Sequence, residues 1–397
     1  MSPITHTLTG ALLGRSWRQR ELPLATATAM LAANAPDIDV FSAFKGEYVE
    51  LAFRRGWTHG VLAWLVLPFA VWGLVLAWDR WVRRRRHPEA PPVEPKVLLA
   101  VAFAGVATHP FLDWLNTYGI RLLMPFSGHW YYGDAVFIVD PWIWLIAGGA
   151  LFLTTQSRNG VIGWGVFGAA AAAALVLAPQ VPRSAKIFWL IAVAVVIAIR
   201  FRRHLRPAVD ARLGRLAVLR LARAGALVYA VYVLTMIAAS VSGARNVRRE
   251  LTKFGWGDLQ QVMYAPAPAD PVKASYVAQT PEGYLRGDYD WLAPSGSEVG
   301  RPTLVPRLSP DTLPGPSGTP TTAGTAGTKP TVDEVLRAAS KTPDAHDYLV
   351  WARFPLYRIE PDGDGWQVRI GDARYMGRGA GGLSGVVVRL DVQLRPR

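Results

Sequence analysis

Histidine and aspartate side chains recur in four short segments that lie within or beside apolar stretches of the sequence. An ionisable side chain is costly in such a stretch, so each of these residues is a candidate for function. Imidazole nitrogen and carboxylate oxygen together suit Zn²⁺, Mn²⁺ or Fe²⁺, and the absence of cysteine removes thiolate ligands. The candidate ligands of a divalent metal are His6, Asp37, Asp39, His59, His109 and Asp113.

The spacing within these segments indicates how the side chains could meet. His109 and Asp113 are four residues apart, which on a helix puts both side chains on one face, about 6 Å apart. Asp37 and Asp39 are two residues apart, so on an extended or turn backbone both could reach one ion or bridge two. These spacings are compatible with one shared metal site.

Each segment alone also has a purely structural interpretation. His59 could cap a helix or contact the membrane interface, and the aspartates at 37 and 39 could cap the next element. His109 and Asp113 could form a plain hydrogen-bonded pair. Convergence of all the segments at one side of a membrane is what favours a metal. Second-rank candidates for ligands or general bases lie in the loop before the apolar segment at about 137–155. They are His129, Asp134 and Asp140.

The elements that would position these residues are apolar stretches of membrane-spanning length. Of 397 residues, 51% are hydrophobic and 18% are charged, which is too apolar for an ordinary soluble enzyme. A span takes about 20 residues. The stretches 3–14 and 22–36 are shorter, and we expect them to be half-helices buried among the others. The predicted spans are 60–82, 96–115, 137–155, 160–178, 185–201 and 224–243.

The net charge of +14 would suggest a nucleic-acid partner for a soluble protein. Residues 1–243 hold 24 Lys and Arg against 12 Asp and Glu, a net of +12, whereas residues 244–397 hold 19 against 17, a net of +2. The excess thus lies in the apolar part, which indicates a membrane and no nucleic-acid partner. Alternating the spans puts 18 of those 24 basic residues on one side, and the positive-inside rule makes that side the cytoplasm.

The remainder of the chain, from 244 to 397, has a different character. Residues 276–292 and 348–394 alternate apolar and polar side chains, which predicts strands, and 309–330 is a Gly-, Pro- and Thr-rich linker or loop. Thr331 and Glu334 form a capping-box pattern that predicts a helix through Ser340. The predicted fold is a mainly α, multi-pass inner-membrane or plasma-membrane bundle of about 6–8 helical segments over 1–243, followed by a small, mostly β, extracytoplasmic domain.

This topology brings the candidate ligands together. The aspartates at 37 and 39, His59, and the His109–Asp113 pair all fall at the extracytoplasmic ends of their segments. His6 begins a 12-residue stretch that reaches about 18 Å, so it would join a site lying somewhat below the outer surface. Four tryptophans at the same ends are expected to form an interfacial belt: Trp57, Trp114, Trp130 and Trp142.

Four ordered motifs resemble one known family. SPITHTLTGALLG, LAANAPDIDVF, RRGWTHGVLAWL and HPFLDWLNTYG are similar in order and spacing to the YdjM-type inner-membrane proteins, regarded as metal-dependent hydrolases, across about residues 1–145. FIVDPWIWL and the FPLYRI and GDARY segments of the tail also resemble long members of that family. The family is in turn thought to be distantly similar to the zinc-dependent phospholipase C and P1 nuclease group, which has multinuclear zinc sites.

The resemblance implies that the six candidates listed first are metal ligands, with Asp140 as a further possibility. Many members carry Asp before the Thr-His of the first motif and His just before the Arg-Gly of the third motif. This chain has Ser2-Pro3 and Arg54 at those places, so we expect one or two ions, zinc before manganese or iron.

Together these observations predict a membrane-bound hydrolase whose metal-activated water attacks a phosphoester or lipid-type substrate. An aspartate free of the metal would take the proton, and the candidates for this role are Asp37, Asp39 and Asp140. One alternative is a non-catalytic anchor that presents the C-terminal domain to a protein partner. A metal-ion transporter is less favoured, because 60–82 and 96–115 carry almost no polar residues below the ligands.

Overall fold

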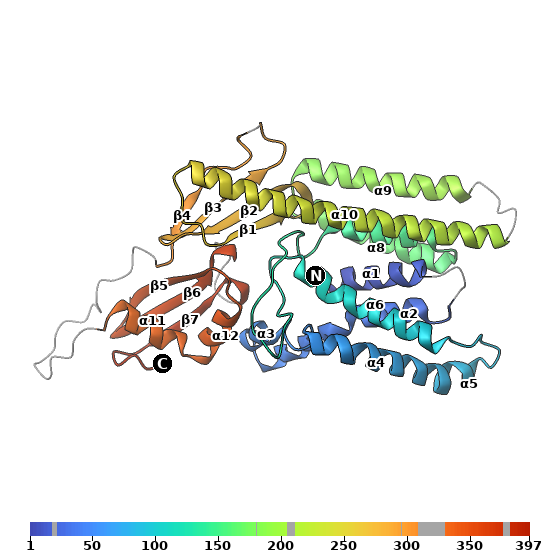
Figure 1. The fold of residues 1–397 in the computed structure, drawn as a ribbon, viewed down its shortest axis with the longest axis horizontal. Coiled ribbons are helices and arrows are strands. Elements are labelled where there is room, and N and C mark those ends of the chain that lie inside the picture. The colour runs from blue at the N-terminus through green and yellow to red at the C-terminus, as the bar shows by residue number, and fades with distance from the viewer. Residues whose placement is uncertain (18–21, 180, 205–210, 295, 309–329, 376–381) are drawn as a thin grey trace, which may run out of the picture.

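The protein is described here by a computed structural model that covers residues 1–17, 22–179, 181–204, 211–294, 296–308, 330–375 and 382–397. The N-terminal part is helical and the C-terminal part contains two antiparallel sheets, as predicted. Figure 1 shows the helices lying roughly side by side, with the C-terminal part packed against one end of the bundle. The predicted linker falls almost wholly on residues 309–329, which lie outside the described part of the chain.

Most apolar stretches of the sequence form helices with bounds close to those expected. The helical elements are α1 (Pro3–Ser16), α2 (Ala25–Asn34), the 3₁₀ helix η1 (Ala35–Lys45), α3 (Glu47–Phe53), α4 (Val61–Trp78), the π-helical turn η2 (Asp79–Arg83), α5 (Arg84–Arg86), α6 (Pro95–Trp114), α7 (Pro141–Thr154), α8 (Arg158–Leu177), α9 (Arg183–His204) and α10 (Ala211–Lys253).

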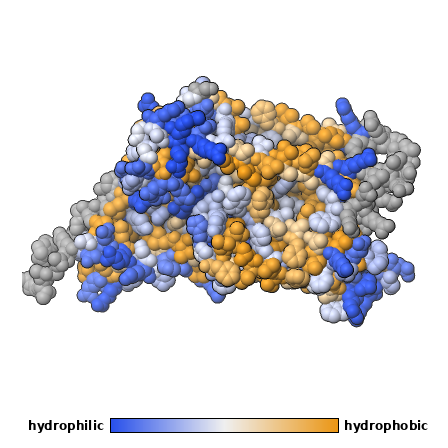
Figure 2. Space-filling view, in the orientation of Figure 1, coloured by the Kyte–Doolittle hydropathy of each residue, from blue (hydrophilic) through white to orange (hydrophobic). Residues whose placement is uncertain are grey.

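Five of the described helices are long and apolar enough to cross a membrane: α4 with its continuation to Arg86, α6, α8, α9 and α10. The stretch predicted to span at 137–155 is shorter in the structure, because α7 has only 14 residues. It begins at Pro141 because the Asp140 carboxylate caps its first turn, accepting hydrogen bonds from the backbone N–H groups of Trp142 and Ile143. On the face drawn in Figure 2, apolar surface covers the helices and hydrophilic surface lies at both ends.

The C-terminal part follows directly from the long helix α10, which continues to Lys253. Strands β1 (Val262–Ala267), β2 (Asp270–Gln279), β3 (Gly283–Asp290) and β4 (Thr303–Pro306) form one antiparallel sheet in that order, and β5 (Pro355–Asp362), β6 (Gly365–Asp372) and β7 (Val386–Leu390) form a second. The remaining elements are α11 (Val332–Ser340), α12 (Pro343–Trp351) and the 3₁₀ turns η3 (Ala373–Tyr375) and η4 (Gly382–Ser384).

Two details of this part test the sequence patterns. The capping box of Thr331 and Glu334 is present at the start of α11, which ends at Ser340 as predicted. The expected strand character of 348–351 is wrong, because these residues end the helix α12. Ala345, Tyr348 and Trp351 are its buried residues, and their spacing of three follows the helical period rather than the period of two of a strand.

Partly buried polar contacts join the two parts of the chain. The guanidinium of Arg353 donates two hydrogen bonds to the Asp134 carboxylate, at 2.8 and 3.0 Å. The indole N–H of Trp130 donates to the carbonyl of Val350, and that of Trp142 to the carbonyl of Ala269. Two of the four tryptophans expected in an interfacial belt therefore also donate hydrogen bonds to the C-terminal part.

Candidate metal centre

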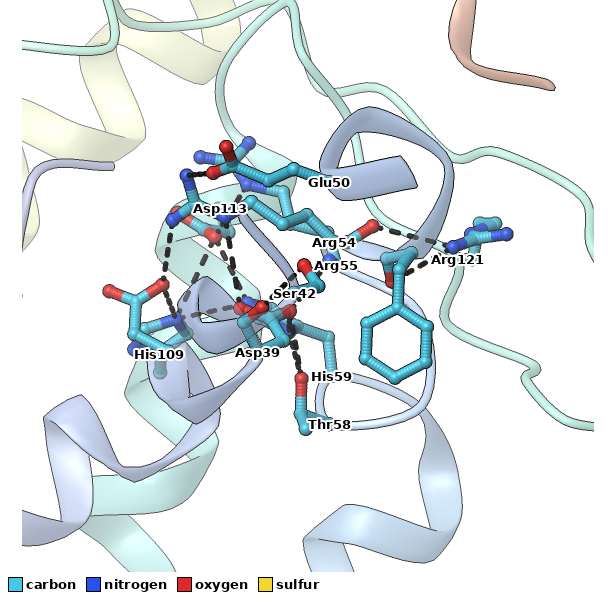
Figure 3. Close-up of polar contacts among 12 residues, drawn as sticks. Asp39, Ser42, Glu50, Arg54, Arg55, Thr58, His59, His109, Asp113 and Arg121 are labelled. Atoms are coloured by element: carbon cyan, nitrogen blue, oxygen red, sulfur yellow. Dashed lines mark hydrogen bonds and ion pairs between the residues drawn. The ribbon is translucent and has the colours of Figure 1, made fainter. Parts of the chain in front are cut away.

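The six candidate ligands come from four elements that meet at the end of the bundle nearest the C-terminal part (Figure 1). The helix α1 carries His6, and α6 carries both His109 and Asp113 close to its C-terminal end. The 3₁₀ helix η1 carries both aspartates of the second segment, and His59 lies in the loop that precedes α4. Figure 3 shows several of these side chains pointing toward one another.

Four ligand atoms form a compact group. One side-chain atom each from Asp37, His59, His109 and Asp113 can be chosen so that all lie within 4.8 Å of one another. The two Nε2 atoms of His59 and His109 are 3.1 Å apart, and Asp113 Oδ2 is 3.2 Å from the first and 3.7 Å from the second. Asp37 Oδ1 is 3.6 Å from His109 Nε2. Ligands on a tetrahedral ion with bonds of 2.0–2.2 Å are separated by about 3.3–3.6 Å.

The outer nitrogens of the two rings determine which form each imidazole takes. His109 Nδ1 lies 2.6 Å from the carbonyl oxygen of Ala33, and a carbonyl can only accept, so this nitrogen carries the proton. His59 Nδ1 lies 3.3 Å from Asp39 Oδ2 and 3.0 Å from the Thr58 hydroxyl. The Thr58 hydroxyl donates its own hydrogen to Asp39, so both neighbours accept from this nitrogen. Burial lowers the pKa of His59, which keeps its ring neutral. Both Nε2 atoms then present bare lone pairs to each other.

Two lone pairs at 3.1 Å beside a carboxylate oxygen repel one another unless a cation lies between them. A carbonyl or carboxylate on the far nitrogen is also the usual partner of a metal-binding histidine, because it fixes the tautomer and the ring orientation. The donor set, with nitrogen and oxygen but no sulfur, fits Zn²⁺, Mn²⁺ or Fe²⁺. The residues present therefore fit a divalent metal ion.

Asp39 does not belong to this group of four but contacts one of its members, His59. Its Oδ2 accepts hydrogen bonds from the backbone N–H of Arg55 at 2.8 Å and from the Thr58 hydroxyl at 2.9 Å, and it faces His59 Nδ1. Burial alone raises the pKa of the Asp39 carboxyl, but the hydrogen bonds that it accepts from the His59 ring, the Arg55 amide and the Thr58 hydroxyl outweigh burial, so the pKa lies below its usual range. Asp39 thus stays ionised and orients His59.

His6 lies on the other side of His109. The two rings stack with centroids 3.6 Å apart, and His6 Nε2 is 3.3 Å from Asp113 Oδ1. The amino group of Met1 also pairs with that oxygen. His6 Nδ1 is buried and has no hydrogen-bond partner among the described residues. The two oxygens of Asp113 therefore face different imidazoles, one toward His6 and one toward His59.

Two arginines that were not among the predicted site residues complete the site. Arg55 is buried, its Nε is 2.9 Å from Asp113 Oδ2, and its guanidinium lies 4.4 Å from the centre of the Tyr118 ring. Arg54 is partly exposed and lies 3.4 Å from Asp37 Oδ1 and 3.7 Å from Asp39 Oδ1. Their charge could have identified them from the sequence. Residues 1–243 hold 24 Lys and Arg, and the predicted topology puts only six of them, including Arg54 and Arg55, on this side of the bundle.

The second-rank candidates lie outside the group. Asp140 caps α7 and accepts a hydrogen bond from the Tyr232 hydroxyl at 2.8 Å. Asp134 is paired with Arg353 of the C-terminal part, and the His129 ring packs against Tyr131. These contacts give Asp140 and Asp134 structural roles.

Comparisons with known proteins support the membrane character of the chain. A family model described as YdjM inner membrane protein matches residues 1–181. An uncharacterised protein of Bacillus subtilis strain 168, YfhP, is 29% identical over 116 residues, which is 29% of this chain and 32% of that protein. The match therefore spans about a third of the curated relative. No solved structure matches. With its five long apolar helices, the chain is a membrane protein.

Proposed function

We propose that this protein is a membrane-bound, metal-dependent hydrolase whose ion is held by Asp37, His59, His109 and Asp113. The observation that carries the proposal is the pair of bare imidazole nitrogens 3.1 Å apart beside an aspartate oxygen. One ion is expected at this group, because the other oxygen of Asp113, which faces His6, is paired with the amino group of Met1. Zinc is the first candidate, with manganese or iron as alternatives.

When bound, a divalent ion supplies Lewis-acid activation of water and of a substrate oxygen. The side chains have separate tasks around it. Asp37 is the carboxylate at the edge of the group, and its Oδ1 is the oxygen that would hold the ion. Its Oδ2 has no hydrogen-bond partner among the described residues, so this second oxygen is the best placed to take a proton. Asp39 and Arg55 hold His59 and Asp113 in position. The contacts of Asp140 argue against a catalytic role for it.

Arg54 favours an anionic substrate. Its guanidinium is 28% exposed at the edge of the site, where it faces Asp37 and Asp39. A partly exposed guanidinium beside a metal is well suited to hold phosphate oxygens. A phosphoester, of the kind cleaved by the zinc-dependent phospholipase C group, is therefore the proposed substrate class.

Metal analysis of the purified protein tests this function. We expect wild type to carry stoichiometric zinc, manganese or iron and to hydrolyse a phosphodiester such as bis(p-nitrophenyl) phosphate, and His59→Ala with His109→Ala to lose both. His346→Ala is the matched control, since that ring is exposed in the C-terminal part. Metal without hydrolysis would favour the transport or binding alternatives. A protein without metal that is unaffected by the double substitution would favour the non-catalytic anchor.

A further inference from the structure

The 3₁₀ helix η1 carries an exposed apolar stripe beside the metal centre. With three residues per turn, side chains three positions apart lie above one another. Ile38, Phe41 and Phe44 share one such stripe and are 57%, 63% and 88% exposed. Pro36 and Asp39, on a different stripe, are the buried residues of the helix. The element that presents the carboxylates thus also presents large apolar side chains outward.

Two further exposed apolar residues lie in the segments that follow η1 along the chain. Phe53, at the end of α3, and Trp57, just before α4, are both exposed, and the rings of Phe41 and Phe44 stack with centroids 6.1 Å apart. We call Ile38, Phe41, Phe44, Phe53 and Trp57 the aromatic ridge. Exposed apolar clusters of this kind on a folded protein mark a surface that contacts another apolar phase or a partner.

The position of the ridge indicates which phase covers it. The helix α4, a membrane-spanning candidate, begins four residues after Trp57, and its exposed residues include Leu62, Leu65 and Val66. The 3₁₀ helix η1 packs against α4, so the ridge and the exposed apolar side chains of α4 lie on contacting elements. Lys45 at the end of η1 is exposed beside the ridge. Aromatic rings with a nearby cation are typical of the boundary between acyl chains and phosphate headgroups.

The edge of the metal centre lies directly beside the ridge. Asp37 precedes Ile38, and Arg54 follows Phe53. These two polar residues are the partly exposed members of the site, whereas the three histidines and Asp113 are fully buried. Whatever covers the ridge therefore also determines what can reach Asp37 and Arg54.

We propose that the aromatic ridge lies in the bilayer interface, so that the metal centre opens to the lipid headgroup layer and takes its substrate laterally from the membrane. The substrate class is then a phospholipid-type phosphoester rather than a water-soluble one. The placement of the ridge stands on its own, whereas the substrate class rests on the proposed hydrolase function.

Spin labels test the placement directly, because the chain has no cysteine of its own. Phe41→Cys and Phe44→Cys are labelled in the full protein reconstituted in phosphatidylcholine and phosphatidylglycerol vesicles. Leu65→Cys on α4 and Leu292→Cys in the C-terminal part are exposed references for lipid and for water. We expect labels at 41 and 44 to collide with oxygen more than with a water-soluble nickel chelate, as at 65 and opposite to 292.

Two results would overturn the placement. Labels at 41 and 44 could behave like the label at 292, which would mean that water covers the ridge. Strong dipolar broadening between labels of different copies would mean that a second copy of the chain covers it. Both outcomes are independent of metal content and of hydrolysis, so they are distinguishable from a failure of the proposed function.

A second comparison tests the route of the substrate. The Phe41→Ser, Phe44→Ser double variant should keep its metal and its hydrolysis of bis(p-nitrophenyl) phosphate. Its activity on phospholipid in vesicles should fall at least about tenfold. Leu292→Ser with Val392→Ser is the matched control, since both side chains are exposed in the C-terminal part. An equal change on both substrates, or none on either, would overturn lateral entry. Wild type that holds metal but cleaves neither substrate would contradict the hydrolase function. The spin labels would still show whether the aromatic ridge lies in the bilayer interface.

Discussion

Asp39 shows how one carboxylate can serve a metal centre without contacting the ion. Its Oδ2 faces His59 Nδ1 at 3.3 Å and is held there by the Arg55 backbone amide and the Thr58 hydroxyl. The proton on Nδ1 leaves Nε2 free to bind, and the negative charge makes the ring a stronger donor to a cation. Asp37, two residues earlier, has the opposite task, because its Oδ1 faces His109 Nε2.

Asp39→Asn should weaken metal binding without abolishing it. The amide keeps the shape of the side chain but removes the charge that supports His59, and such changes typically cost about 10–100-fold in metal affinity. Competition with a chelator of known affinity measures the change. Asp140→Asn is the control, since the Asp140 carboxylate caps α7 and accepts a hydrogen bond from the Tyr232 hydroxyl rather than from a ligand. Complete loss of the metal in Asp39→Asn would show that Asp39 is itself a ligand.

At the level of residues, the sequence was informative about which side chains meet, but not about their separate roles. The spacing of His109 and Asp113 on one helix face was sufficient to pair them. No spacing rule states which oxygen of Asp37 or Asp39 faces which ring, because that depends on the turn of η1. The contact of Arg55 with Asp113 joins a loop to the end of α6, and a distant contact of this kind has no local pattern.

At the level of elements, the short helix α2 packs very closely against α1 and α6 and so positions part of the site. A side chain added at Gly10 of α1 would place its Cβ 2.6 Å from the carbonyl oxygen of Ala29, and one at Gly105 of α6 would place it 2.7 Å from the Ala32 Cβ. Only glycine allows α2 to lie this close to both helices. The same packing brings the Ala33 carbonyl to His109 and sets the start of η1.

Gly105→Ala should therefore destabilise the protein and weaken its metal site together. Alanine is favoured over glycine in a helix by about 1 kcal/mol, but here the added Cβ forces α2 away, and overpacking of this kind costs about 1–3 kcal/mol. Thermal unfolding in detergent and metal occupancy are the two measurements. Gly163→Ala on α8 is the control, because nothing lies within 4 Å of its added Cβ, and it should be neutral or stabilising. If both variants behave alike, the α2 packing does not support the site.

The elements that the sequence predicted well are those with a strong single pattern. The long apolar runs gave α4, α6, α8 and α9 nearly as expected. The 3₁₀ geometry of residues 35–45 was not predicted, because its stripes every third residue resemble neither a helix nor a strand in a short segment. In α12, the YLVW run fits a strand locally, but the buried residues Ala345, Tyr348 and Trp351 are spaced by three, which fits a helix.

At the scale of the whole molecule, basic residues collect at the end of the bundle opposite the metal centre. The guanidinium of Arg15 donates to the Thr154 carbonyl at 3.1 Å, and that of Arg200 to the Phe152 carbonyl at 2.8 Å, so the ends of α1 and α9 both meet the C-terminal end of α7. Figure 2 shows hydrophilic surface at this end as well as over the C-terminal part. The positive-inside rule predicts that the arginine-rich end lies in the cytoplasm.

This assignment predicts that the metal centre, the aromatic ridge and the C-terminal part all lie on the extracytoplasmic side. A membrane-impermeant maleimide applied to spheroplasts should label Leu292→Cys, and should label Arg85→Cys only after permeabilisation. Both positions are exposed, and the chain has no native cysteine to confuse the result. The two variants are each other's controls, because a leaky membrane would label both at once. Labelling of Arg85→Cys alone in intact spheroplasts would reverse the orientation, and would place the proposed lipid substrate in the cytoplasmic leaflet.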